Sequence, residues 1–286
     1  MEENNKIEGL EKFMEDQKQE KRFLRELIDK HVHNNNKLLV TRLNMGKTQF
    51  GSAARAIESY TGKMKIDEIA DRVLLGSDMS FMKNKIDEAT KKVKIDEENI
   101  NLILQRVPTW DRRRALAGYL ISNNFRKFTT ILVVVTPRWV ELPHHENWGA
   151  DGRALKDAIE FEALDSKGDI GLIDITGQDV FALDGQHRVM GLKGLKELAT
   201  THKFDEKDKS GKSKRESTLD EWMEEYDIDD IAEITQILDE SISLEFVPAV
   251  LTGETREEAT ERLRNIFFNI NTNAKKIDTN EQTIMD

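Results

Sequence analysis

The chain has 286 residues and a formal net charge of −11, with 34% charged and 38% hydrophobic residues. No stretch approaches the ~20 uncharged apolar residues of a membrane span, and residues 1–13 do not have the pattern of a secretory signal. Because cysteine is absent, disulfides, thiolate metal sites and a thiol nucleophile are excluded. We expect a cytoplasmic protein whose acidic balance argues against non-specific coating of nucleic acid, although a local basic patch can still bind it.

The first hundred residues predict mainly helix. Apolar spacing and turn signals indicate a charged amphipathic helix over 2–35 and a short strand over 37–43, and then helices over 50–60, 66–75 and 79–94. We therefore divide the chain into an N-terminal helix at 1–35, a helical part at 36–100 and a core domain at 101–286.

Beyond residue 101, helices and strands are mixed without regular alternation, which predicts an α+β fold. A helix is expected from an N-cap at Thr109 to Ser122, and others begin near His187 and at the capping box Thr255-x-x-Glu258. Strands are predicted over 128–135, 158–164, 170–175, 180–183 and 242–251. Residues 201–230 contain 17 charges, 11 of them acidic, and are expected to form an exposed insertion or lid.

The most specific motif is Asp184-Gly185-Gln186-His187-Arg188, placed between a predicted strand and a predicted helix. A helix N-terminus offers unpaired N–H groups and partial positive charge, which suit an anion. Gly185 permits a sharp turn, and His187 and Arg188 can add donors to a phosphate. Asp184 can hold Mg²⁺ or orient water. A plain Asp N-cap with surface His and Arg remains the alternative.

A second candidate is Arg112 in the first turn of the helix that follows Thr109. At 100° per residue it is predicted to lie about 35° from the centre of the apolar face formed by Leu116, Tyr119 and Leu120. An inward-facing charge needs a partner. We therefore expect Arg112 to reach a phosphate or carboxylate near Arg188, with a snorkelling Arg at the edge of the core as the alternative.

Residues 105–127 form the most basic stretch, with Asp111 as the one acid. Such a cluster is typical of contacts to a nucleic-acid backbone. The predicted DNA-binding residues are Arg106, Arg113, Arg114, Arg126 and Lys127.

Leu183 and the five motif residues, followed by an apolar helix, resemble the signature of the DGQHR-domain family. Its best-known members are DndB-type proteins associated with DNA phosphorothioation, in which sulfur replaces a non-bridging phosphate oxygen. The family is grouped with the ParB/sulfiredoxin-like superfamily, where a comparable strand–loop–helix corner holds nucleotide phosphates. Gln105-Arg106 and the Asn/Lys-rich segment at 267–276 extend the resemblance over roughly 101–278.

The resemblance implies a mixed β-sheet of ParB/sulfiredoxin-like type with surrounding helices and an N-terminal helical extension. It also implies DNA binding, control of modification genes, and a site for ATP or another nucleotide with Mg²⁺. Phosphate or nucleotide contacts would come from Gly185, Gln186, Arg188, Arg112, Asn271 and Lys275. Sulfiredoxin activity is not carried over, because it requires a cysteine. A structural turn is the alternative interpretation of the Asn/Lys segment.

Two other functions stay open. One is a nucleotide hydrolase or DNA-nicking enzyme, in which Asp184 binds Mg²⁺ and His187 acts as acid or phosphate ligand. The other is a non-catalytic assembly factor, which would form a homo-oligomer or recruit modification-system proteins through residues 1–35. Nothing in the sequence indicates zinc, haem or an iron–sulfur cluster.

Overall fold

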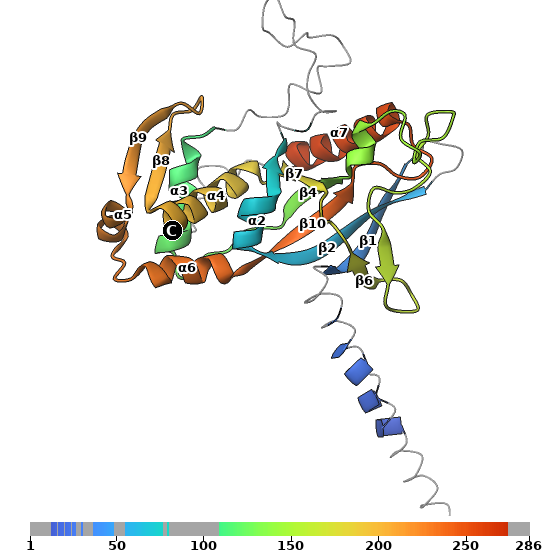
Figure 1. Cartoon of the computed structure of the whole chain (residues 1–286), viewed down its shortest axis with the longest axis horizontal. Helices are drawn as coiled ribbons and strands as arrows, with labels where there is room; N and C mark the ends of the chain where they lie inside the picture. The colour runs from blue at the N-terminus through green and yellow to red at the C-terminus, as the bar shows by residue number, and fades with distance from the viewer. Residues whose placement is uncertain are drawn as a thin grey trace, which may run out of the picture.

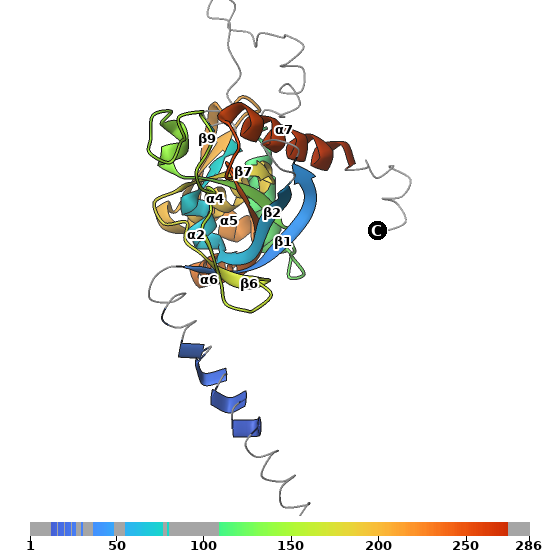
Figure 2. The same ribbon diagram turned by 90° about the vertical axis from the view of Figure 1, so that its right-hand side faces the viewer.

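A computed structural model describes most of the chain from residue 37 to residue 273 (Figures 1 and 2). The described residues are 13–15, 17–19, 21–23, 25–26, 30, 37–48, 55–76, 79 and 109–273. Among them, no helix combines the length and the apolar character needed to cross a membrane.

The centre of the molecule is an eight-stranded mixed sheet with the order β3-β7-β4-β10-β2-β1-β6-β5. Its strands are β1 (Leu38–Thr48), β2 (Arg55–Lys65), β3 (Val73–Leu75), β4 (Ile131–Thr136), β5 (Phe161–Ala163), β6 (Ile170–Ile173), β7 (Asp179–Asp184) and β10 (Ser241–Pro248). The β3–β7 and β4–β10 pairs are parallel, and the other neighbours are antiparallel. The α+β class predicted from the sequence is confirmed.

Helices cover both faces of this sheet. One face carries α2 (Ile66–Arg72), α3 (Arg112–Ser122), α4 (Gln186–Thr201), α5 (Leu219–Tyr226) and α6 (Ile231–Asp239). A two-stranded hairpin, β8 (Lys203–Lys207) and β9 (Ser213–Thr218), packs beside α3 and α4. The other face carries α7 (Arg256–Asn273), which lies opposite α2 and α4 in Figure 2. A 3-10 helix at Arg138–Glu141 follows β4.

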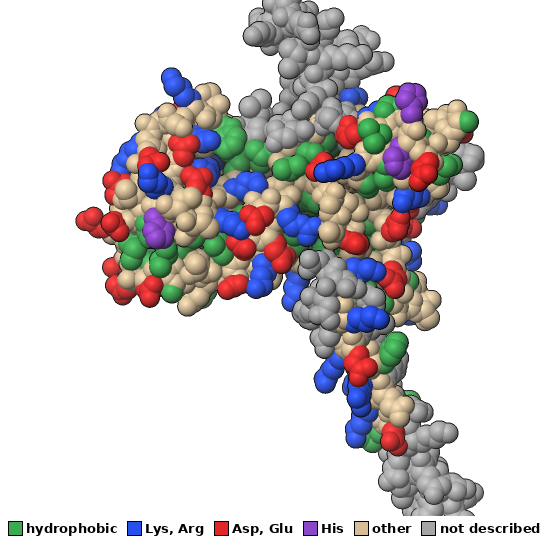
Figure 3. All heavy atoms as spheres, viewed as in Figure 1, with side chains coloured by type: hydrophobic (Ala, Val, Ile, Leu, Met, Phe, Trp, Pro, Cys, Tyr) green, Lys and Arg blue, Asp and Glu red, His purple; other side chains and the backbone are tan. Residues whose placement is uncertain are grey.

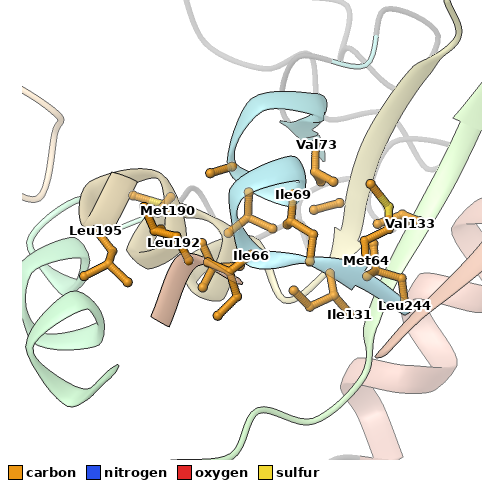
Figure 4. Close-up of a cluster of buried hydrophobic side chains, with 14 of the residues drawn as sticks. Met64, Ile66, Ile69, Val73, Ile131, Val133, Met190, Leu192, Leu195 and Leu244 are labelled. Atoms are coloured by element: carbon orange, nitrogen blue, oxygen red, sulfur yellow. The ribbon is translucent and has the colours of Figure 1, made fainter. Parts of the chain in front are cut away.

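Strand β4 shows why two hydrophobic layers form. All six of its residues are buried, and successive side chains of a strand point to opposite faces. Ile131 and Val133 therefore join the layer under α2 and α4, whereas Leu132 and Val134 join the layer under α7. Figure 4 shows the first layer, where Leu192 of α4 and Ile69 of α2 approach the sheet. Burying each such side chain contributes roughly 1.5–3 kcal/mol.

The predicted helix over 50–60 is wrong where the structure describes it, because residues 55–65 form β2. This strand lies between β1 and β10 and pairs with both. Its alternate residues Tyr60 and Met64 are buried, which gives β2 a half-buried pleat. Two long neighbouring strands thus override a local preference for helix. Strands from both sides of the boundary expected at residue 100 belong to one sheet.

The expectation of an exposed insertion at 201–230 holds only in part, because most of its residues are exposed but a few of them are buried in the core. Phe204 and Trp222 are fully buried, with ring centroids 4.8 Å apart. The Trp222 indole N–H donates to Ser217 Oγ at 2.8 Å. The charges that suggested solvent exposure are partly used in ion pairs: Arg114 of α3 bonds Glu206 and Glu225. The segment is therefore anchored to the core by Phe204 and Trp222, while the tip of its hairpin is exposed.

Several local predictions are confirmed. The strand at 37–43, the antiparallel β5–β6 pair, β7 and the start of α4 lie where the pattern places them. In the capping box, Thr255 N donates to Glu258 Oε2 at 2.9 Å, and Glu258 N donates to Thr255 Oγ1 at 3.2 Å. The helix predicted over 66–75 ends at Arg72, where β3 follows. Residues 80–94 of the predicted helix at 79–94, and much of 2–35, lie outside the described residues.

Candidate functional site

The motif forms a tight corner between β7 and α4. Strand β7 ends at Asp184, and Gly185 takes the left-handed conformation with φ 86° and ψ 19°. A Cβ at Gly185 would lie 2.9 Å from Arg188 Nη2. Glycine is therefore required here both by the backbone angle and by the close approach of a side chain.

The N-terminus of α4 has no side-chain cap. Its N-cap is Gly185, which provides no side-chain hydrogen bond, and the first turn contains no acidic residue. By contrast, Thr218 and Asp230 close the starts of α5 and α6 with complete capping boxes. The predicted alternative of an Asp184 cap is thus wrong, and no side chain caps the first turn of this 16-residue helix.

Arg188 joins the two sides of the corner. Its Nη2 donates to Asp184 Oδ2 at 3.0 Å, and its Nη1 donates to the carbonyl oxygens of Thr129 and Thr130 at 2.5 and 3.1 Å. The Thr129 hydroxyl is a further partner. The guanidinium therefore ties the end of β7 to the chain that enters β4. A phosphate would have to compete with these bonds to engage Arg188.

His187 contacts a residue that precedes α3. Thr109 N donates to His187 Nε2 at 3.0 Å, and Thr109 Oγ1 lies 2.9 Å from the same nitrogen. Because a backbone N–H can only donate, Nε2 is the acceptor and the ring proton lies on Nδ1. Thr109 was expected to cap α3, but the N-cap position is Asp111. The sequence did not predict this contact, because Thr109 and His187 are 78 residues apart and no local pattern indicates that they meet.

Gln186 is the third feature of the corner. Its side chain is 9% exposed, and its Oε1 is buried without a hydrogen-bond partner among the described residues. Buried polar atoms are usually paired, so an unpaired one indicates a place where a ligand or water donates. The Gln186 side chain thus marks the corner independently of the helix terminus.

The structure reverses the predicted roles of Arg112 and Arg113. Arg112 is exposed, whereas Arg113 is 5% exposed, because Ala117 and Leu120 rather than Leu116 define the inner face of α3. Arg113 bonds Glu197 and donates to the Asp205 carbonyl at 3.0 Å. Its guanidinium also stacks over Phe204, 4.7 Å from the ring centroid. A buried cation with these partners is not available to a phosphate.

The other predicted DNA-binding residues are spread over different contacts. Arg114 bonds Glu206 and Glu225 and lies 4.4 Å from the Trp222 ring centroid. Arg126 bonds Glu240. Lys127 is exposed, and its backbone N–H donates to Tyr119 Oη at 3.0 Å. Arg106 lies outside the described residues.

Only part of the Asn/Lys segment lies among the described residues. Asn271 was expected in a turn beyond a helix, but it lies within the last turn of α7. In Figure 2 that end of α7 points away from α4. Lys275 lies outside the described residues.

Asp184 is the one carboxylate that the motif brings to the corner. Its Oδ2 pairs with Arg188, and its side chain is 37% exposed. A nucleotide-bound Mg²⁺ usually takes one or two protein carboxylates and fills its other positions with phosphates and water. Asp184 fits that role as a single ligand. Within the described part of the chain, no group of three or more His, Cys, Asp or Glu residues could hold a metal by itself.

Comparisons of the chain with family models, with curated proteins and with solved structures give no match. The geometry of the corner and the motif therefore carry the functional argument.

Proposed function

We propose that this chain is a DndB-like, DNA-binding regulatory protein of a DNA phosphorothioation system, with a phosphate- or nucleotide-binding site at the DGQHR corner. The observation that carries the site is the N-terminus of α4, which follows the left-handed Gly185 and has no side-chain cap. The DNA-linked role comes from the resemblance of the motif and its flanking segments to the DGQHR-domain family.

The first-turn N–H groups of α4 are the primary phosphate contacts in this proposal. Three N–H groups, those of Gln186, His187 and Arg188, precede the first intrahelical bond, which Val189 N makes to Gly185 O at 3.0 Å. Arg188 acts as a positioning residue, since its bonds to Asp184 and Thr129 fix the corner. Asp184 would provide one oxygen to the Mg²⁺ of a nucleotide.

Nucleotide binding can be tested with a charge placed at the corner. Gln186→Glu puts a carboxylate in the first turn of α4, where it should repel phosphate, and we expect ATP or CTP to bind at least roughly ten-fold more weakly by calorimetry. Thr200→Glu adds the same charge at the exposed far end of α4 and should leave binding unchanged. Equal binding by the wild type and Gln186→Glu, with both folded, contradicts a phosphate site here.

Hydrolysis is the alternative that the same corner allows. Asp184 ends β7 and His187 lies in the first turn of α4, so a carboxylate and an imidazole stand on either side of Gly185 and Gln186. We expect no phosphate release from ATP or CTP with Mg²⁺, with or without duplex DNA. Turnover that disappears in Asp184→Ala would make the corner a hydrolytic centre and favour the enzyme.

DNA binding separates the regulator from the assembly factor. A regulator should bind duplex DNA in a salt-sensitive and sequence-dependent manner, and Asp184→Ala should retain that binding. A chain that binds neither nucleotide nor DNA, and needs residues 1–35 to find a protein partner, would be an assembly factor.

A further inference from the structure

The charges of residues 201–230 are segregated along the sequence. Residues 207–215 contain five basic residues and one acidic residue, Asp208, whereas most of the acids follow from Glu216 onward. This short stretch therefore has a charge of +4 in a chain whose net charge is −11. In the structure it forms the tip of the β8–β9 hairpin.

The turn uses its one carboxylate internally. Asp208 Oδ1 accepts from Ser210 N at 2.9 Å, from Ser210 Oγ at 2.6 Å and from Lys212 N at 3.0 Å. Gly211 takes φ +90° and completes the turn. The acid thus holds the loop closed, and it makes no ion pair within 4.0 Å in the described part of the chain.

Three exposed lysines project from this turn, and none of them lies within ion-pair distance of a carboxylate in the described residues. They are Lys209, Lys212 and Lys214. Their neighbours differ: Lys207 lies 3.6 Å from Asp205, and Arg215 lies 2.6 Å from Glu221. We call these three residues the lysine tip. Figure 3 shows basic side chains projecting at this end of the molecule, near the tip of the hairpin.

A tryptophan fixes the hairpin and links it to the DGQHR corner. Lys207 Nζ lies 4.6 Å from the Trp110 ring centroid, and a Cβ on Gly211 would lie 3.0 Å from two atoms of the same ring. Trp110 directly follows Thr109, whose N–H and hydroxyl contact His187. Thr109 therefore contacts the DGQHR corner, and the neighbouring Trp110 contacts the turn of the hairpin.

We propose that the lysine tip is the surface through which this protein contacts the phosphate backbone of duplex DNA. This inference rests on the proposed DNA-binding function. The lysine tip takes the DNA-contacting role predicted from the sequence for Arg113 and Arg114 of α3. Lysine is a compact charge that suits sequence-independent phosphate contacts. The tip carries Ser and Gly between its lysines and no apolar side chain, so it matches a polyanion better than a membrane. The acidic remainder of the chain orients the tip toward DNA.

The test is a salt titration of binding to a fluorescent duplex of roughly 30 base pairs. In the full chain, Lys209→Gln, Lys212→Gln and Lys214→Gln are combined. The slope of log K against log salt is about −0.9 for each phosphate contact, so the loss of three contacts should reduce its magnitude by about 2 to 3. At about 0.1 M salt the variant should bind at least roughly ten-fold more weakly.

The matched control combines Lys63→Gln, Lys65→Gln and Lys167→Gln, which removes three exposed positive charges from β2 and from the β5–β6 turn. It should keep the wild-type slope. If the tip variant keeps the wild-type affinity and slope, or if both variants weaken equally, the lysine tip is not the contact, although DNA binding stands. If the wild type does not bind duplex DNA, the proposed regulatory function itself fails, and the inference fails with it.

Discussion

At the residue scale, Gly185 is the position where backbone and side-chain constraints coincide. Its φ of +86° disfavours any residue with a Cβ, and the space beside it holds Arg188. The Arg188 guanidinium cannot move away without breaking its bonds to Asp184 and Thr129. Gly177 has a similar φ of +69° but nothing within 4 Å of a Cβ.

We therefore expect Gly185→Ala to destabilise the protein more than Gly177→Ala. A left-handed alanine costs roughly 1–2 kcal/mol, and at Gly185 the displaced Arg188 adds to this cost. The free energy of unfolding from urea titration measures both variants. If the two variants lose the same free energy of unfolding, Arg188 moves aside without further destabilisation, and its contact does not constrain residue 185.

A second residue-scale feature is the buried ion pair between Arg262 of α7 and Glu254 in the loop before it. Both side chains are 2% exposed. Arg262 Nε donates to Glu254 Oε1 at 2.7 Å, and its Nη2 donates to the Pro248 and Ala249 carbonyls at 3.1 and 3.2 Å. The pair thus connects the end of β10 to α7.

Arg262→Met should lower the free energy of unfolding by about 3–5 kcal/mol, because Glu254 would remain buried without its counter-ion. Combining it with Glu254→Gln should recover part of that loss. Lys65→Met, which removes an exposed ion pair with Asp239, should have little effect. A double variant as unstable as the sum of its single changes would show that the two side chains act independently.

At the element scale, the β5–β6 and β8–β9 turns are each held by an aspartate whose carboxylate accepts backbone N–H bonds. Asp165 accepts backbone N–H bonds from Ile170 and Lys167 in the β5–β6 turn, and Asp208 plays the same part in the β8–β9 turn. A backbone donor at Ile170 lowers the pKa of Asp165, and the Ser210 hydroxyl lowers that of Asp208. Such a carboxylate stabilises its turn only while it is ionised.

Acid should therefore loosen the lysine tip. Because the folded pKa of Asp208 lies below its ordinary 3.8, its stabilising contribution is present above that value and is lost as the pH falls through the folded pKa. Asp208→Asn should speed amide exchange at Lys212 near pH 6, and the difference from the wild type should shrink as the pH falls below 3.8 and the carboxyl is protonated. Asp179→Asn, at an exposed position, serves as the control. If the difference in amide exchange between Asp208→Asn and the wild type does not change with pH, ionisation of the Asp208 carboxyl is not its cause.

At the scale of the whole molecule, the sheet unites the two halves of the chain. Strand β10 pairs with β2 on one side and β4 on the other, and β7 pairs with β3. The buried side chains Tyr60, Met64 and Ile69 come from the first half and pack in the same layer as α4. Neither half encloses a complete core by itself.

A chain that begins at residue 109 should consequently show no cooperative thermal transition, since it exposes an edge of β10 and lacks part of the core. A chain that begins at residue 37 keeps every described strand and should unfold like the full protein. Calorimetry distinguishes the two. Cooperative unfolding of the shorter chain would show that the core domain predicted at 101–286 is independent after all.

The sequence alone determined the features that depend on neighbouring residues. The β7–Gly185–α4 corner, the β5–β6 turn and the capping box at Thr255 follow from turn chemistry, capping and short-range periodicity. These signals are local because the groups that satisfy each other lie within a few residues. The phosphate-binding role of the corner, which was also inferred from the motif, stays a prediction.

Only the tertiary structure decided which residues face the core and which charges stay unpaired. Periodicity placed Arg112 inward, but the helix packed against α3 makes Arg113 the buried residue. Neighbours on both sides turned residues 55–65 into a strand. Glu206 and Glu225 pair with Arg114 of α3, whereas the lysines of the tip have no carboxylate within 4.0 Å in the described residues. Such outcomes depend on contacts between residues far apart in the chain, which no local pattern encodes.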